Sequence, residues 1–214
     1  MHRHLSLVED SEDSVLVSAV LSGYELYALM NQVGGRSCKE HHERTILREI
    51  LHALENNDMS SYPHSVPDEI KRVMEYADQM HVFDSGCTLT MVVIHTPTGG
   101  VWIINLGRNN VMYISDEIYT FPKHDMGNPK EAQRMMEISQ PVYPFKETRL
   151  LGFTRYKSYG GLSPIPDVYS TNKPGTIVVT TPDVYTPDEL ANYVLSGGSL
   201  SSLRGITGFA VRIE

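Results

Sequence analysis

Residue types that bind metal ions gather at one place in this sequence. The string Cys38–His42 reads CKEHH, and His64 and His81 follow further along the chain. A structural zinc site needs about four ligands that converge on one point. Here the candidates lie on or beside the polar side of a predicted helix. We therefore interpret the string as a solvated helix start rather than a zinc site.

The chain contains two cysteines, Cys38 and Cys87, far apart in the sequence. Cys87 with a histidine could form a nucleophile–base pair. A disulfide framework is typical of small secreted chains with several regularly spaced cysteines, and this chain does not show that pattern. We expect two buried, reduced thiols.

Composition limits the possible partners and the compartment. The 214 residues carry a formal net charge of -8, and no run of lysine and arginine stands out, so nucleic acid is excluded as an expected partner. No apolar run approaches the ~20 residues of a membrane span, and the N-terminal residues lack the apolar middle of a signal peptide. We expect one soluble domain over residues 1–214, cytoplasmic or otherwise intracellular. The sequence does not indicate an oligomeric state.

A predicted β-meander from Phe83 to Phe121 organises the rest of the chain. Its runs suit a pleated sheet, and turns rich in glycine and asparagine separate them. Two of the runs are apolar on both faces, so both faces of the sheet should be covered. The predicted strands are Cys87–His95, Val101–Leu106, Val111–Ile114 and Ile118–Phe121.

Other segments predict strands and helices around this sheet. Ser14–Leu21, Thr176–Thr181 and Gly208–Ile213 are predicted strands, and Pro141–Pro174 reads as irregular surface with a strand near Arg149–Phe153. Predicted helices are Tyr24–Gln32, Lys39–Asn57, one starting at Ser65–Asp68, Asn128–Ile138, and one opened by the capping box Thr186–Glu189. The order favours an α+β fold in which two antiparallel sheets pack together with helices outside.

Several short strings follow one another along the chain: Val8–Asp10, Leu21–Tyr24, Asp84–Thr88, Asn105–Asn109, Phe121–Asp125, Asn128–Glu131, Arg149–Arg155, Ile177–Tyr185 and Gly205–Thr207. In this order they resemble the metal-dependent serine/threonine phosphatases of type 2C. The resemblance covers nearly the whole chain and implies a central β-sandwich flanked by helices, with Cys87 as a small core residue.

The family uses two divalent cations, Mg²⁺ or Mn²⁺, bridged by carboxylates, to activate a water molecule. Most of the implied ligands are missing here: a serine, a proline and two arginines stand where the family has aspartates. Shifting the alignment by one residue would make Asp183 a ligand. The vestigial positions are Glu9, Asp10, Ser22, Gly23, Arg108, Pro182, Asp183 and Arg204.

The resemblance and its departures together predict a pseudophosphatase without catalytic residues, metal or other cofactor. We expect a protein-binding, regulatory or scaffold module, alone or as a subunit of a larger assembly, whose partner is a protein. The tyrosine-rich stretch Tyr143–Tyr169 is the candidate binding surface, and Arg108 with Arg204 could together bind an anion. The alternative is an active phosphoserine/phosphothreonine hydrolase with displaced ligands.

Overall fold

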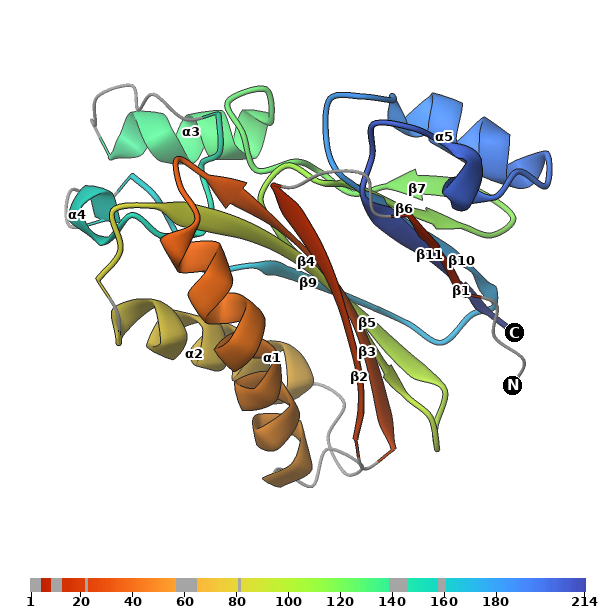
Figure 1. Ribbon diagram of the computed structural model, residues 1–214, viewed down its shortest axis with the longest axis horizontal. Coiled ribbons are helices and arrows are strands. Elements are labelled where there is room, and N and C mark those ends of the chain that lie inside the picture. The colour runs from red at the N-terminus through yellow and green to blue at the C-terminus, as the bar shows by residue number, and fades with distance from the viewer. Residues whose placement is uncertain are drawn as a thin grey trace.

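The computed structural model describes residues 5–8, 13–21, 23–56, 65–80, 82–138, 146–157 and 161–214. Two antiparallel β-sheets lie face to face, and helices cover their outer sides (Figure 1). The helices are α1 (Ser37–Asn56), α2 (Ser65–Gln79), α3 (Pro129–Glu137), α4 (Thr154–Lys157), α5 (Pro187–Leu195) and the short 3-10 helix η1 (Leu200–Ser202).

One sheet has five strands and the other has six, and the main path of each sheet contains five strands. The five-stranded sheet has the order β1 (Leu5–Val8), β11 (Gly208–Ile213), β10 (Gly175–Thr180), β6 (Asn110–Ile114) and β7 (Ile118–Thr120). The six-stranded sheet has the order β2 (Ser14–Leu21), β3 (Tyr24–Val33), β4 (Gly86–His95), β5 (Gly100–Leu106) and β9 (Asp167–Thr171), with β8 (Leu151–Gly152) paired to β4 off this path. This arrangement confirms the predicted fold class.

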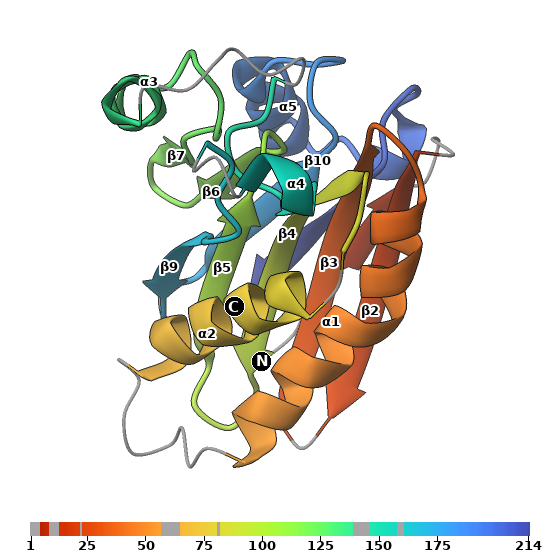
Figure 2. The same ribbon diagram turned by 90° about the vertical axis from the view of Figure 1, so that its left-hand side faces the viewer.

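The buried side chains form three main layers. One lies between the six-stranded sheet and the pair α1 and α2, which run side by side over its outer face (Figure 2). A second lies between the two sheets, and a third lies beneath α5. Fully buried examples are, in that order, Ile50, Phe209 and Leu190.

The predicted meander is present, but its strands divide between the sheets. β4 and β5 pair within the six-stranded sheet, whereas β6 and β7 belong to the five-stranded sheet. The turn after β5 makes the crossing at Gly107, whose φ is +120°. A Cβ atom there would lie 2.4 Å from Cγ2 of Thr88, so the crossing requires glycine at this position.

The sequence predicts a mostly buried Trp102 with Val92 and Ile104 nearby, and Trp102 on β5 is 6% exposed. It lies in the layer beneath α1 and α2 together with Ile104. Val92, expected beside it, instead faces the layer between the sheets, because neighbouring residues of a strand point to opposite faces.

The predicted helix at Tyr24–Gln32 is wrong: the segment is strand β3. It pairs along its whole length with β4 on one side and, from Tyr24 to Asn31, with β2 on the other. Leu26 and Met30 face the helices, and Leu29 faces the other sheet. A strand buried on both faces has apolar residues at spacings that also fit a helix, and here the pairing with two neighbours decides.

The remaining predicted elements are found within two residues of their expected bounds. Asn128 caps α3 and accepts a hydrogen bond from Lys130 N, and Thr186 and Glu189 form the expected capping box of α5. The segment predicted as irregular contains the unpredicted strand β9, and its residues 141–145 and 158–160 lie outside the described residues. In the described part of the chain, no helix is long and apolar enough to cross a bilayer.

Candidate functional site

An arginine surrounded by carboxylates lies at one end of the sandwich. Arg108 follows Gly107 in the turn between β5 and β6. Its Nη1 and Nη2 donate to the two carboxylate oxygens of Asp183 at 3.0 and 2.9 Å, and its Nε donates to Asp125 at 3.0 Å. Glu147 lies 3.8 Å from Nη1. We call Arg108, Asp125, Glu147 and Asp183 the Arg108 cluster.

The environment of the cluster favours the charged forms of Asp183 and Arg108. The hydrogen bonds from Arg108 lower the pKa of Asp183 and outweigh its partial burial. Burial opposes the charge on Arg108, but the bonds to Asp183 and Asp125 still raise its pKa. The Arg108 side chain is only 12% exposed, so these interactions are partly shielded from water.

Two lysines complete the charge balance. Lys146 Nζ lies 3.6 Å from Asp183. Lys123 is also close enough to interact electrostatically with Asp183 and Arg108, and burial lowers its pKa. The cluster and these lysines therefore carry three positive and three negative charges. Such a balanced group has little net attraction for a divalent cation.

Some of the predicted vestigial positions come together at this end. Pro182 and Asp183 directly follow Thr181, whose backbone N donates to Thr207 O and whose Oγ1 accepts from Thr207 N, just before β11. Arg204 lies just before that same strand and is exposed. Glu9, Asp10 and Ser22 lie outside the described residues.

Arg108 fits the interpretation of a structural arginine better than that of an anion site shared with Arg204, two possibilities that the sequence leaves open. Its three guanidinium nitrogens all donate to carboxylates of its own cluster. An anion bound beside Arg204 would have to displace these carboxylates.

Gly23 lies at the opposite end of the sandwich. It occupies the β2–β3 turn, where its carbonyl oxygen accepts hydrogen bonds from the backbone and side chain of Thr96 at 2.7 and 2.9 Å. Strand β3 separates this turn from the Arg108 end by about 30 Å, since a strand rises about 3.3 Å per residue. Gly23 therefore lies far from the Arg108 cluster, and Ser22 is outside the described residues.

The sequence prediction places the family string where an apolar strand runs into a helix, and in the structure this description fits β3 and α1. The end of β3 brings Asn31 to the Arg108 end of the sandwich. Its Nδ2 donates to Thr88 Oγ1 at 3.2 Å and to Oδ1 of Asn109, the residue after Arg108. Sequence reasoning missed Asn31 because β3 was predicted as a helix. The signal that could have found it is the pair Gly34–Gly35 directly before the long helix.

His124 supports the Arg108 turn from behind. Its Nδ1 accepts from Gly107 N at 3.0 Å, and its backbone N donates to Gly107 O at 2.9 Å. Because Nδ1 accepts, Nε2 carries the proton and donates to Asp167 at 3.1 Å. That bond, with Arg149, holds the pKa of Asp167 well below its ordinary value against the effect of burial.

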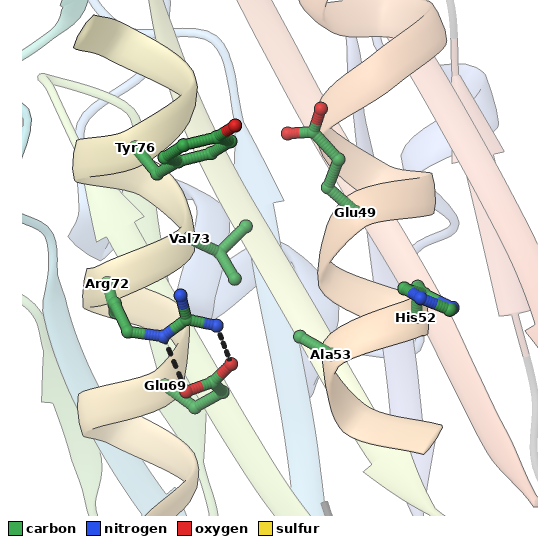
Figure 3. A pocket seen from close by; sticks show the side chains of 7 residues that line it. All are labelled: Glu49, His52, Ala53, Glu69, Arg72, Val73 and Tyr76. Carbon is green, nitrogen blue, oxygen red and sulfur yellow. Dashed lines mark hydrogen bonds and ion pairs between the residues drawn. The ribbon is translucent and has the colours of Figure 1, made fainter. Parts of the chain in front are cut away.

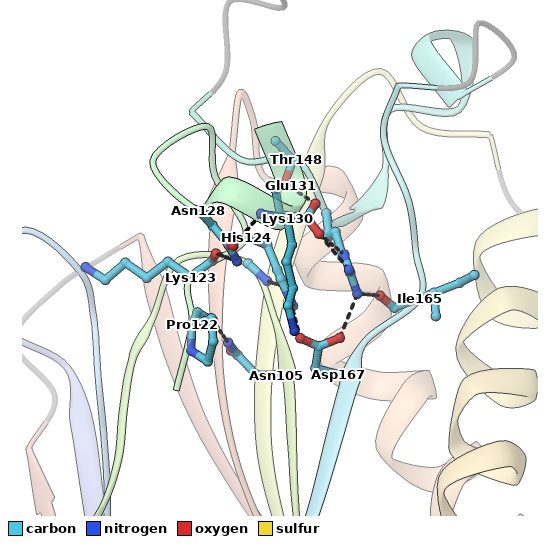
Figure 4. Close-up of polar contacts among 12 residues, drawn as sticks. Asn105, Pro122, Lys123, His124, Asn128, Lys130, Glu131, Thr148, Ile165 and Asp167 are labelled. Carbon is cyan, nitrogen blue, oxygen red and sulfur yellow. Dashed lines mark hydrogen bonds and ion pairs between the residues drawn. The ribbon is translucent and has the colours of Figure 1, made fainter. Parts of the chain in front are cut away.

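The same network continues to a buried glutamate on α3 (Figure 4). Glu131 is 1% exposed and accepts from Arg149, Arg134 and Thr148, the shortest distance being 2.6 Å. Burial raises the pKa of Glu131, but these donors outweigh it and hold the pKa at about 2. Arg149 also donates to Asp167 at 2.9 Å, so the network joins α3 to β9 behind the site.

A groove of about 330 Å³ lies elsewhere, between α1 and α2 (Figure 3). Val73 and Ala53 supply its apolar lining, and the half-exposed ring of Tyr76 lies opposite Glu49. The residues that line it are Glu49, His52, Ala53, Glu69, Arg72, Val73 and Tyr76.

Only one of the two carboxylates in this groove is neutralised by a described residue. Glu69 accepts two hydrogen bonds from Arg72. Glu49 Oε2 is buried and has no hydrogen-bond partner among the described residues. A buried charged oxygen without a partner is energetically costly, so a cation entering the groove would be stabilised there.

The CKEHH string is only partly a solvated helix start. Cys38 and His42 are fully buried, and Lys39 is 7% exposed, because these positions face the sheet. Within the described ranges, no three His, Cys, Asp or Glu side chains are grouped so that they could hold a metal ion. His64 and His81 lie outside those ranges.

Comparison with known proteins gives a clear result for structure and none for sequence. No family model and no curated protein matches the chain. A serine-threonine phosphatase 2C from Toxoplasma gondii superposes with a TM-score of 0.72 at 12% identity, over 99% of this chain and 94% of that one. The serine/threonine phosphatase of S. agalactiae gives 0.64 at 14% identity, over the whole of both chains. The chain has the phosphatase 2C fold.

A sex-determining protein of C. elegans also shares this fold, with a TM-score of 0.73 at 12% identity. The match covers 99% of this chain but 64% of the worm protein, so this chain spans less than two thirds of that relative. At such identities the likeness establishes the fold and leaves activity open.

Proposed function

We propose that this protein is a catalytically inactive, intracellular phosphatase-like module that acts by binding a protein partner. The Arg108 cluster is the observation that supports this most. Arg108 stands where the resembled family has a metal-binding aspartate, and its guanidinium engages the carboxylate of Asp183 through both oxygens. A cationic side chain thus takes the electrostatic place of a bound cation.

The residues present do not fit a pair of bridged dications. Hard cations need several oxygen ligands that are not already paired. Asp125, Glu147 and Asp183 all face Arg108. Asn31, at the end of β3, offers a neutral amide where we infer that the family's bridging aspartate falls. A dication here would have to displace Arg108 without gaining a bridging carboxylate.

Incubation with phosphoserine and phosphothreonine peptides in millimolar Mn²⁺ or Mg²⁺ tests the catalytic half of the proposal. We expect no phosphate release above a boiled control. Metal-dependent release that follows the protein through purification would instead support the active hydrolase with displaced ligands, and would overturn the proposal.

We further propose that the groove between α1 and α2 is the docking surface, and that it takes an arginine side chain of the partner protein. A guanidinium can pair with the unpartnered Glu49, lie against the ring of Tyr76, and cover Val73 with its aliphatic stem. The net charge of -8 favours a basic partner at longer range. The stretch Tyr143–Tyr169 remains a prediction, since part of it is outside the described residues.

Titration with N-acetyl-arginine methylamide, followed by amide NMR shifts, tests this docking surface. We expect millimolar binding that perturbs α1 and α2, weakens at least fivefold in Glu49→Gln, and is unchanged in Glu40→Gln, an exposed glutamate of the same helix. The uncharged citrulline analogue should not bind. Equal shifts from citrulline, or binding that survives Glu49→Gln, would refute the assignment.

A further inference from the structure

The two cysteines of this chain meet in the core. Cys38 lies in the first turn of α1 and Cys87 is the second residue of β4, 49 positions apart. Both are 0% exposed free thiols, and their Sγ atoms lie 3.5 Å apart. The thiols are buried and reduced, as the sequence predicts, but their contact was not foreseen.

Backbone hydrogen bonding fixes the position of each cysteine in the Cys38–Cys87 contact. Cys38 N donates to Ser85 Oγ at 3.1 Å, which fixes the first turn of α1 against the start of β4. Cys87 pairs with Leu151 of β8. The next residue, Gly152, leaves the room that Cys38 needs, because a Cβ atom there would lie 2.6 Å from Cys38 Sγ. The two sulfur atoms therefore face each other because α1, β4 and β8 pack together at this point.

We propose that Cys38 and Cys87 form a reversible redox site whose oxidant is a hydroperoxide and whose product is an intramolecular disulfide. One thiol attacks hydrogen peroxide, forming a sulfenic acid and releasing water. The second thiol attacks that sulfur, forming the S–S bond and releasing a second water. Overall, two thiols and one hydrogen peroxide give one disulfide and two waters.

The geometry demands little movement. A disulfide has an S–S length of about 2.05 Å, so the sulfurs must approach by about 1.5 Å. No third cysteine competes, since the chain has only these two. Bond formation would tie the start of α1, one wall of the groove, to the central strand of the six-stranded sheet.

Two features make the reaction slow in the closed protein. Burial is the main cause that raises the pKa of Cys87, and the hydrogen bond with Cys38 adds to it. Cys87 therefore remains in its thiol form, which is a poor nucleophile. Access also requires local opening. The nearby Lys157 ammonium, only 11% exposed and paired with Asp78, acts in the other direction by favouring the Cys87 thiolate.

The test exposes native protein to millimolar hydrogen peroxide, removes it, denatures the chain, alkylates the remaining thiols and maps peptides by mass spectrometry. We expect monomers that lose both alkylation sites, a peptide pair joined through Cys38 and Cys87, and recovery with dithiothreitol. The melting temperature should rise by several degrees before reduction, because the bond closes a long loop.

Two serine variants and an internal control for oxidation make the result of this test unambiguous. In Cys38→Ser and Cys87→Ser, the joined peptides should disappear; circular dichroism checks that each variant is folded. Met136 is 73% exposed, so its conversion to the sulfoxide shows that the peroxide was active in the sample. Oxidised Met136 with two fully alkylated cysteines, or sulfinic acids or intermolecular dimers in place of the joined peptides, would overturn the proposal.

Discussion

The change Glu131→Gln should destabilise this fold strongly while leaving its shape intact. The glutamate is buried on α3 and accepts from Nε and Nη2 of Arg149 at 2.9 and 2.6 Å and from Nη2 of Arg134 at 2.9 Å. Glutamine has nearly the same volume but carries no charge and turns an NH₂ group toward one of the arginines. Both guanidinium groups then lose their buried counter-charge.

Two independent estimates give a similar magnitude. Removing one partner of a buried ion pair costs about 3–5 kcal/mol. Arg149 and Arg134 are 18% and 25% exposed, so water relieves part of that cost and the lower end applies. The pKa of Glu131 falls from its ordinary 4.5 to about 2, which corresponds to about 3 kcal/mol at about 1.4 kcal/mol per tenfold change in proton affinity.

Urea unfolding of both proteins, followed by circular dichroism from pH 7 to pH 2, is the assay. Because the folded-state pKa of Glu131 is lowered, its contribution is complete above about pH 4.5 and is lost as the pH falls toward 2. The variant should therefore be about 3 kcal/mol less stable at pH 7, with a difference that shrinks over this acid range.

Glu137→Gln is the matched control, since Glu137 is an exposed residue of the same helix. It should change the free energy of unfolding by less than about 0.5 kcal/mol. A loss below 1 kcal/mol for Glu131→Gln at pH 7, or a difference between the two proteins that does not change with pH, would refute the reasoning.

Three further substitutions test the fold by urea unfolding. Trp102→Ala should cost about 3–5 kcal/mol through a cavity beneath the helices, and a solvent-like tryptophan emission in the native protein would contradict its burial. Thr186→Ala should cost about 1 kcal/mol by removing the cap of α5; no loss would mean that the capping box is not formed in solution. Gly107→Ala should cost more than about 2 kcal/mol because of positive φ and the clash with Thr88. Gly205→Ala, with positive φ but only an ordinary contact between its new Cβ atom and Val184 at 3.7 Å, should cost less, and equal costs would argue against the clash.

Local signals predicted much of this fold from the sequence. The capping box at Thr186–Glu189 and the Asn128 cap fix the starts of α5 and α3 by contacts within four residues. The alternation and turns of the meander likewise depend on near neighbours. Such features are readable because the interactions that create them are close in the sequence.

The sequence-based predictions failed where pairing with residues distant in the sequence determines the secondary structure. β3 carries a pattern that fits helix or buried strand, and only β2 and β4 select the strand. β9 is an edge strand without a clear alternation, and it forms because β5 offers a partner. The division of the meander between two sheets depends on packing at Gly107, which the sequence marks only as a turn.

The candidate site was predicted in part. The departures from the family pattern identified Arg108, and the alternative alignment identified Asp183, but their bidentate contact joins residues 75 positions apart. Asp125 and Glu147 were not singled out, because no local pattern indicates that they converge on Arg108. Asn31 was hidden by the wrong assignment of β3.

Calorimetric titration with Mn²⁺ tests the central claim, that Arg108 takes the electrostatic place of the metals, most directly. The account predicts only weak, salt-sensitive heats for the unaltered protein. It also predicts at least tenfold tighter binding in Arg108→Asp, because that change leaves the carboxylates of Asp125, Glu147 and Asp183 without their arginine. Micromolar Mn²⁺ affinity in the unaltered protein that is lost in Asp10→Ala would contradict the account.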